Sequence, residues 1–184
     1  MKKLKRILQL TLIIAMSAIF MAGCAPAPDL GENAPEAGTE FAAFTAKDLD
    51  GNEVTESVFS QAKLTMINVW GTFCGPCLEE MPDLGELSKE YADAGLQIIG
   101  IVSDATESGT NVEEAKEIIA QTGADYLHIL PSEDLIESWL KDLAFVPATV
   151  FVDQNGNIVG ELVAGSRDKA DWETIIDERM ASAN

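Results

Sequence analysis

The feature that most constrains this chain is a pair of cysteines placed where a buried strand meets a helix. Cys74 and Cys77 enclose a Gly-Pro dipeptide. The preceding residues 64–70 (LTMINVW) are mostly apolar and β-branched, which is typical of a strand buried on both faces. Apolar side chains at helical spacing follow over residues 75–94. The first cysteine is therefore expected at the N-terminus of a helix.

That position favours redox chemistry at the pair. Unpaired backbone N–H groups and the partial positive charge of a helix N-terminus stabilise a thiolate. They lower the pKa of the Cys74 thiol below that of a free cysteine, about 8.5. Glu79 and Glu80 oppose this effect, so we expect a modest depression of that pKa. A loop closed over two intervening residues adds little stability through chain entropy, which favours a redox-active disulfide between Cys74 and Cys77.

A zinc half-site and an inert structural disulfide are the alternatives for the pair. Zinc needs four N or S ligands, and besides the pair the chain offers only Cys24 and His128. His128 lies in an apolar run and is expected to be a packed strand residue. Residues 153–157 (DQNGN) resemble part of a calcium loop but lack the later glutamate, so a turn is expected there. We expect no metal and no cofactor.

Residues 1–23 have the pattern of a lipoprotein signal peptide. Four cations precede a mostly apolar stretch of sixteen residues at 7–22, shorter than the roughly 20 residues of a membrane-spanning helix. Met-Ala-Gly then precedes Cys24, and this resembles a bacterial lipobox in which Cys24 carries lipid. A generic cleaved signal peptide and an uncleaved anchor are the alternatives. All three interpretations predict a domain outside the cytoplasm, and the lipobox interpretation predicts a lipid anchor on the cell membrane.

Composition separates a tether from the folded domain. Residues 24–39 are rich in Pro, Gly and acidic residues and have little to bury, so we expect a flexible tether. The domain is expected over residues 40–184. The formal net charge of the chain is -19, which argues against nucleic acid as a partner because phosphate binding needs clustered cations. An acidic, solvated surface favours a monomer.

The remaining sequence alternates strands with helices. Further strands are expected over residues 96–103 and 126–130, and further helices over 55–61, 111–122, 132–143 and 168–181. Hairpins are expected over 41–54 and over 148–153 with 157–163. This order predicts an α/β fold, a three-layer α/β/α sandwich with a mixed central sheet and an N-terminal hairpin.

Several motifs together resemble one family. They are the Trp70-Gly71-Thr72 segment before the first cysteine, the Cys-Gly-Pro-Cys motif, Pro82 in the following helix, and Val146-Pro147-Ala148-Thr149 followed by VFVDQNG. The chain is similar to the TlpA/ResA-type extracytoplasmic thiol–disulfide oxidoreductases, in lipoprotein form, over about residues 40–182. Residues 111–130 resemble the helix–strand insertion of that family, and Asn68 stands where cytoplasmic thioredoxins carry a buried aspartate. Phe73 departs from the tryptophan or alanine of many members.

The resemblance implies a thioredoxin-like fold and particular roles for residues. Glu80 lies one helical turn after Cys77, where a partly desolvated carboxyl has a raised pKa and takes the proton of Cys77. A solvated glutamate is the alternative for this position. Pro147 is expected in cis, facing the cysteines, with an ordinary trans proline as the alternative. Contacts to substrate are expected from Trp70, Phe73, Gly75, Pro76 and Val146.

The function implied is reduction of disulfides in extracytoplasmic client proteins. Electrons are expected from a membrane donor of the CcdA/DsbD type, and the clients are apocytochrome c or a secreted methionine sulfoxide reductase. A disulfide-forming oxidase and a non-catalytic lipoprotein binding module are the alternatives. A peroxidase of the peroxiredoxin group is disfavoured, because Ile67 and Gly71 stand where its motif has proline and threonine.

Overall fold

A five-stranded mixed sheet forms the centre of the molecule. The structure is a computed structural model that describes residues 36–183. The strands are β3 (Leu64–Trp70), β4 (Leu96–Val102), β5 (Leu127–Ile129), β6 (Ala148–Asp153) and β7 (Val163–Ala164), in the order β5-β4-β3-β6-β7. β3 and β4 are parallel, as are β4 and β5, whereas β6 is antiparallel to β3 and β7. The predicted signal peptide (1–23), the lipid site Cys24 and most of the predicted tether lie outside the described residues.

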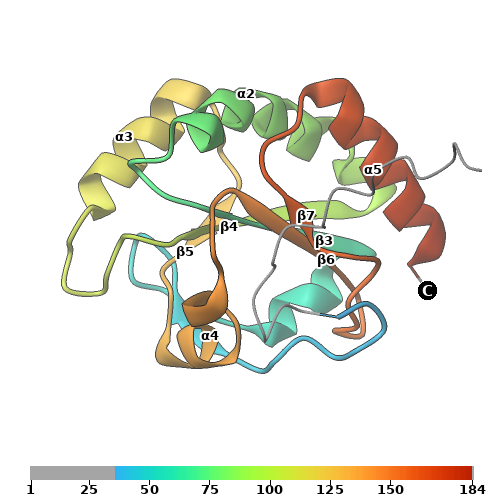
Figure 1. Cartoon of the computed structure of the whole chain (residues 1–184), viewed down its shortest axis with the longest axis horizontal. Helices are drawn as coiled ribbons and strands as arrows, with labels where there is room; N and C mark the ends of the chain where they lie inside the picture. The colour runs from blue at the N-terminus through green and yellow to red at the C-terminus, as the bar shows by residue number, and fades with distance from the viewer. Residues whose placement is uncertain (1–35, 184) are drawn as a thin grey trace, which may run out of the picture.

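Helices cover both faces of this sheet (Figure 1). On one face lie α2 (Gly75–Glu90), α3 (Val112–Thr122) and α5 (Lys169–Ser182); on the other lie α4 (Glu133–Ser138), the 3₁₀ segments η1 (Glu56–Gln61) and η3 (Leu140–Asp142), and the hairpin of β1 (Thr45–Lys47) and β2 (Glu53–Thr55). A third 3₁₀ segment, η2 (Ala92–Ala94), follows α2. The predicted three-layer sandwich with its N-terminal hairpin is confirmed, and α3 with β5 forms the expected helix–strand insertion.

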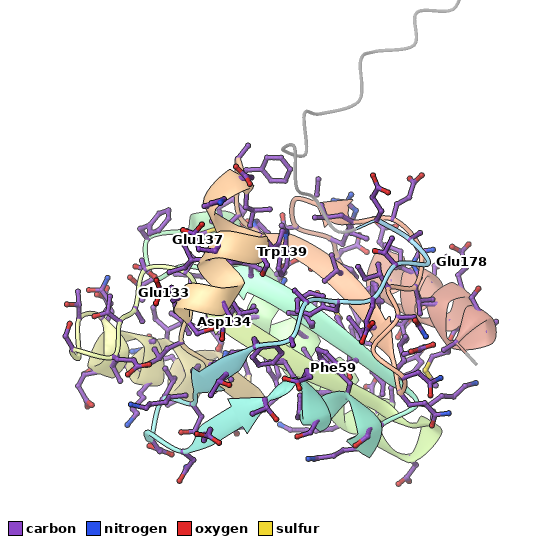
Figure 2. The ribbon with its side chains drawn as sticks, turned by 90° about the horizontal axis from the view of Figure 1, so that it is seen from below. Phe59, Glu133, Asp134, Glu137, Trp139 and Glu178 are labelled. Carbon is purple, nitrogen blue, oxygen red and sulfur yellow. A yellow bond between two sulfur atoms is a disulfide. The ribbon has the colours of Figure 1, made fainter. Side chains whose placement is uncertain are left out.

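β3 carries the core on both of its faces. All seven of its residues are buried. Leu64, Met66 and Trp70 pack in the clusters on the α2 side, and Ile67 and Val69 pack in the opposite cluster. That opposite cluster contains Phe59 of η1 and Trp139 at the end of α4, which Figure 2 labels on the face of the molecule turned toward the viewer. Because side chains alternate along a strand, Asn68 shares the α2-facing side.

Three predicted elements have different boundaries in the structure. The helix expected over 132–143 ends at Ser138, because Trp139 leaves helical geometry (φ -148°, ψ -54°) and packs edge-on against Phe41 in the core. The second strand expected over 157–163 is reduced to β7, since the backbone turns at Gly160 with φ 75°. The long helix expected to reach residue 94 also stops at Glu90, and η2 completes the segment.

The last residues of the predicted tether contact the domain. Gly38 N donates a hydrogen bond to Ile158 O at 2.8 Å, and Ile158 N donates to Thr39 O at 2.8 Å. Residues 36–39 are therefore attached to the sandwich rather than free of it. Within residues 36–183, none of the helices is both long enough and apolar enough to cross a bilayer.

Candidate active site

The cysteine pair opens helix α2. Cys74 is the N-cap residue, and its Sγ accepts a hydrogen bond from Cys77 N at 3.3 Å. A disulfide joins the two residues. Cys74 is 5% exposed and Cys77 is fully buried, so only the first sulfur lies near the surface. The expected position at a helix N-terminus is confirmed, with Pro76 in the first turn where its missing N–H leaves no partner unpaired.

Cys74 lies at the edge of an open, largely apolar groove. The groove has a volume of about 520 Å³ and is lined by Val69, Phe73, Cys74, Gly75, Pro76, Ser103, Leu140, Leu143, Ala144, Phe145 and Val146. Phe73 projects with 72% of its surface exposed. Four of the five expected substrate-contact residues (Phe73, Gly75, Pro76 and Val146) are thus gathered around the outer sulfur.

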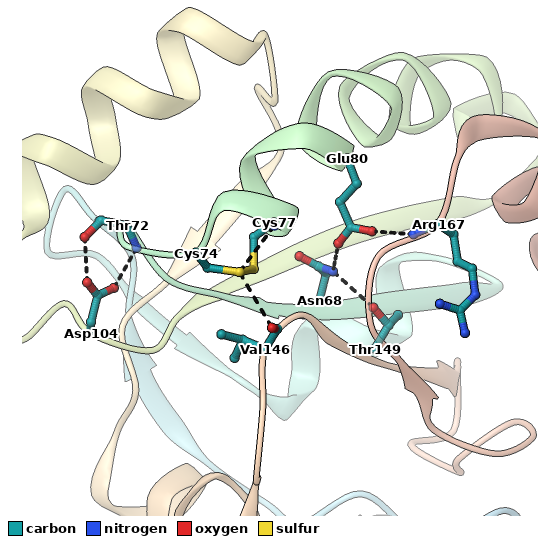
Figure 3. Close-up of a disulfide and its surroundings, with 9 residues drawn as sticks. All are labelled: Asn68, Thr72, Cys74, Cys77, Glu80, Asp104, Val146, Thr149 and Arg167. Atoms are coloured by element: carbon teal, nitrogen blue, oxygen red, sulfur yellow. Dashed lines mark hydrogen bonds between the residues drawn. A yellow bond between two sulfur atoms is a disulfide. The ribbon is translucent and has the colours of Figure 1, made fainter. Parts of the chain in front are cut away.

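The groove wall opposite the cysteines is the Val146–Pro147 segment. Its peptide bond is cis, as expected, and Pro147 is buried. Val146 O lies 3.7 Å from Cys74 Sγ, and Figure 3 shows this carbonyl facing the disulfide. An extended partner peptide can therefore run between this segment and the start of α2, with its sulfur next to Cys74.

Trp70 does not belong to this groove, and its expected substrate contact is corrected. Its side chain is fully buried, and Nε1 donates to His128 Nδ1 at 3.1 Å. His128 Nε2 is therefore the protonated nitrogen and donates to Ala124 O at 2.9 Å. Burial lowers the pKa of His128 to about 4, so the imidazole is neutral at physiological pH. The pair supports β3 just before the active-site turn, and His128 is the packed residue that was expected.

The Trp70–His128 pair predicts a cost for Gly100→Ala. A methyl group at Gly100 would collide with the imidazole of His128 and lie 3.0 Å from Trp70 Nε1. His128 cannot move aside without losing its two hydrogen bonds. We expect the free energy of unfolding to fall by about 1–3 kcal/mol in a denaturant titration. Gly75→Ala is the matched control, because nothing lies within 4 Å of its added methyl; equal stability of the two variants would contradict the prediction.

A carboxylate just after the end of β4 holds the turn before Cys74. Asp104 accepts hydrogen bonds from Thr72 N at 3.0 Å and from Thr72 Oγ1 at 2.6 Å. Asn111 Nδ2, at the start of α3, donates to the same carboxylate at 2.9 Å. The turn is thereby fixed to the insertion helix. Sequence reasoning missed Asp104, since nothing local distinguishes it from the many other acidic residues.

Glu80 is buried beneath the cysteines, with 2% of its surface exposed. Oε1 accepts from Asn68 Nδ2 at 3.0 Å, and Oε2 accepts from the backbone N–H of Arg167 at 3.1 Å (Figure 3). Oε2 also accepts from Trp172 Nε1 at 3.2 Å. Burial raises the pKa of Glu80, and these donors oppose the rise in part. The alternative of a solvated glutamate is excluded for Glu80, whereas Glu79 beside it is exposed.

The arrangement supplies two sulfurs and one buried carboxyl. Among residues 36–183, no three His, Cys, Asp or Glu side chains converge as metal ligands would. The outer sulfur can be reached from the groove and meets an N–H donor at the helix start. The inner sulfur is shielded, and the carboxyl of Glu80 lies one turn further along α2. This geometry suits thiol–disulfide exchange through a transient mixed disulfide.

Comparisons of this chain with known proteins agree on one family. Residues 36–176 match the Redoxin family. The thiol-disulfide oxidoreductase ResA of Bacillus thuringiensis subsp. konkukian is 27% identical over 71% of this chain and 72% of its own. ResA of Geobacillus thermodenitrificans is 27% identical over 93% and 94%. The crystal structure of a thioredoxin-family thiol:disulfide interchange protein from Chlorobium tepidum superposes with a TM-score of 0.65 at 24% identity, covering 80% of this chain and 99% of that one.

Proposed function

Because this chain belongs to the Redoxin family and is a thiol–disulfide oxidoreductase of the TlpA/ResA type, we propose that it reduces disulfides in client proteins outside the cytoplasm. The observation that carries the proposal is the different accessibility of the two sulfurs. Cys74 lies at the groove and Cys77 lies behind it, fully buried. A client disulfide can meet the first sulfur only.

The reaction runs in two exchanges. The Cys74 thiolate attacks one sulfur of the client disulfide; a Cys74–client bond forms, and the other client sulfur leaves and takes a proton. Glu80 then accepts the proton of Cys77, and Cys77 attacks Cys74 Sγ. The Cys74–Cys77 bond forms and the first client sulfur leaves. Two electrons pass to the client, and the protein is left with its disulfide.

Reduction is favoured over oxidation by the surroundings of Cys74. A strong oxidant of this kind needs a strongly stabilised thiolate in its reduced form. In the structure Cys74 Sγ accepts one N–H bond, from Cys77, and the buried Glu80 carboxyl lies one turn beyond Cys77. Neither feature stabilises the Cys74 anion strongly. We therefore propose that the cysteine pair acts as a reductant of client disulfides.

The reduction potential of the pair tests this direction. Equilibrating the purified protein with a dithiothreitol redox series should give a value near that of thioredoxin, about -270 mV. A value near that of DsbA, about -120 mV, would establish the oxidase instead. Retained function in cells of the double variant Cys74→Ser, Cys77→Ser would favour a non-catalytic binding module.

Cellular placement completes the proposal. We propose a monomer held at the extracytoplasmic face of the cell membrane by lipid on Cys24, receiving electrons from a membrane donor of the CcdA/DsbD type. The clients are apocytochrome c or a secreted methionine sulfoxide reductase. The signal pattern before Cys24 and the ResA relatives support this placement. Metabolic labelling with a radioactive fatty acid should label the unsubstituted chain and fail to label Cys24→Ala, and an unlabelled unsubstituted chain would argue against the lipid anchor.

A further inference from the structure

Asn68 carries a buried oxygen that the mechanism above does not use. The residue is fully buried in β3, on the face that packs against α2. Its Nδ2 donates to Glu80 Oε1 at 3.0 Å and to Thr149 Oγ1 at 3.1 Å, so both amide hydrogens are engaged. Its Oδ1 is buried without a hydrogen-bond partner. Native proteins seldom leave such an acceptor unpaired, because its burial costs free energy.

The direction of this oxygen identifies what it can meet. Figure 3 shows Oδ1 on the side of Asn68 that faces the Cys74–Cys77 disulfide, away from Glu80. Rotating the amide by half a turn would set Oδ1 against Glu80 Oε1, which brings two acceptors together. While Glu80 is ionised, the amide nitrogen must therefore face the carboxylate, and the oxygen must face the cysteines.

Reduction of the pair creates the missing donor. Neither sulfur of a disulfide carries hydrogen, so Oδ1 gains nothing from the cysteines in the oxidised protein. Adding two electrons and two protons to the disulfide yields two thiols, and ionisation of Cys74 leaves the S–H group on the buried Cys77. A thiol is a weak donor and an amide oxygen is a good acceptor.

We propose that Asn68 Oδ1 accepts a hydrogen bond from Cys77 Sγ–H in the reduced protein, which makes Asn68 the positioning residue between Cys77 and Glu80. This inference rests on the proposed function and extends it. The negative end of the amide dipole favours the thiol form of Cys77, so the negative charge of the reduced pair resides on Cys74. Asn68 does not relay the proton, because its amide would have to change tautomer; Glu80 accepts that proton in the mixed disulfide.

The S–H stretching band in the infrared spectrum tests the hydrogen bond directly. In Cys74→Ser, Cys77 remains a thiol, and its band should lie at the lower frequency of a bonded S–H. Adding Asn68→Leu, which has a similar volume and no acceptor, should shift the band to the frequency of an unbonded thiol. Thr149→Val is the matched control, since it removes the other partner of Nδ2 and should leave the band in place. All variants retain Cys24, so any S–H band from this residue cancels in the difference spectra between variants.

A second measurement needs no substitution at Asn68. The ¹³C chemical shift of the Asn68 side-chain carbonyl should differ between the oxidised and reduced forms of the unsubstituted chain. The side-chain carbonyl of Asn157, whose Nδ2 donates to Asp153 in a distant turn, should keep the same shift in both forms. An unmoved band in Asn68→Leu, or an identical Asn68 shift in both redox forms, would overturn the inference. Failure of the unsubstituted protein to reduce any disulfide would instead overturn the proposed function.

Discussion

Replacing Cys77 with serine is expected to stop the reaction halfway, with Cys74 held to its client in a stable mixed disulfide. The first exchange needs only the groove and the outer sulfur, and both remain. The second exchange needs the buried thiol, and serine cannot replace it. Turnover should fall by about three orders of magnitude or more, as expected when a nucleophile is removed. Mass spectrometry under non-reducing conditions should show the adduct.

Cys74→Ser is the control for this experiment. It should give no adduct with clients, because Cys77 is fully buried and has no access to the groove. The reverse outcome, an adduct in Cys74→Ser and none in Cys77→Ser, would show that the roles of the two sulfurs are exchanged. That result would contradict the mechanism, in which Cys74 attacks the client and Cys77 resolves the mixed disulfide.

Glu80→Gln is expected to slow the second exchange by about 10²- to 10⁴-fold, the range for removal of a general base. The substitution keeps the size of the side chain and one acceptor oxygen, but it cannot take the proton of Cys77. Formation of the mixed disulfide should not slow, because that step needs no base. Rapid mixing with a chromophoric disulfide separates the two steps. Glu79→Gln, on the exposed neighbour, should leave both rates unchanged, and an unaltered second step in Glu80→Gln would remove Glu80 from the mechanism.

The same reasoning gives a pH dependence for the second exchange. Burial raises the pKa of Glu80 above the ordinary glutamate value of 4.5. As pH falls through that raised pKa the carboxylate is protonated and can no longer act as base, so the second exchange should slow at a pH above 4.5. Glu80→Gln should lack this limb of the profile. If the variant still slowed at low pH, the slowing would have to be assigned to another titrating group.

The central part of the fold could be predicted from local patterns. The apolar, β-branched run of residues 64–70 identified the buried strand, and the cysteine pair after it identified the start of α2. The position of Glu80, three residues after Cys77 on one helix, predicted its burial near the pair. Each of these inferences uses residues within a few turns of one another.

The rest of the site depends on contacts between distant segments. Trp172 and the backbone of Arg167 bind Glu80 from 92 and 87 residues away, and Thr149 binds Asn68 from 81 residues away. No spacing rule joins such positions in a single sequence. Trp70 illustrates the converse error: the family resemblance implied a substrate contact, but the alternation of β3 turns the side chain into the core to meet His128.

The charge state of Cys74 in the reduced protein tests the account most directly. Alkylation of each cysteine can be followed across pH by mass spectrometry of the fragment containing residues 74–77. Cys74 should react with a half-point clearly below about 8.5, the pKa of a free cysteine, while Cys77 stays protected as a buried thiol. Two cysteines that both react with a half-point near 8.5 would contradict the account, because the start of α2 would then give neither sulfur the charge that exchange requires.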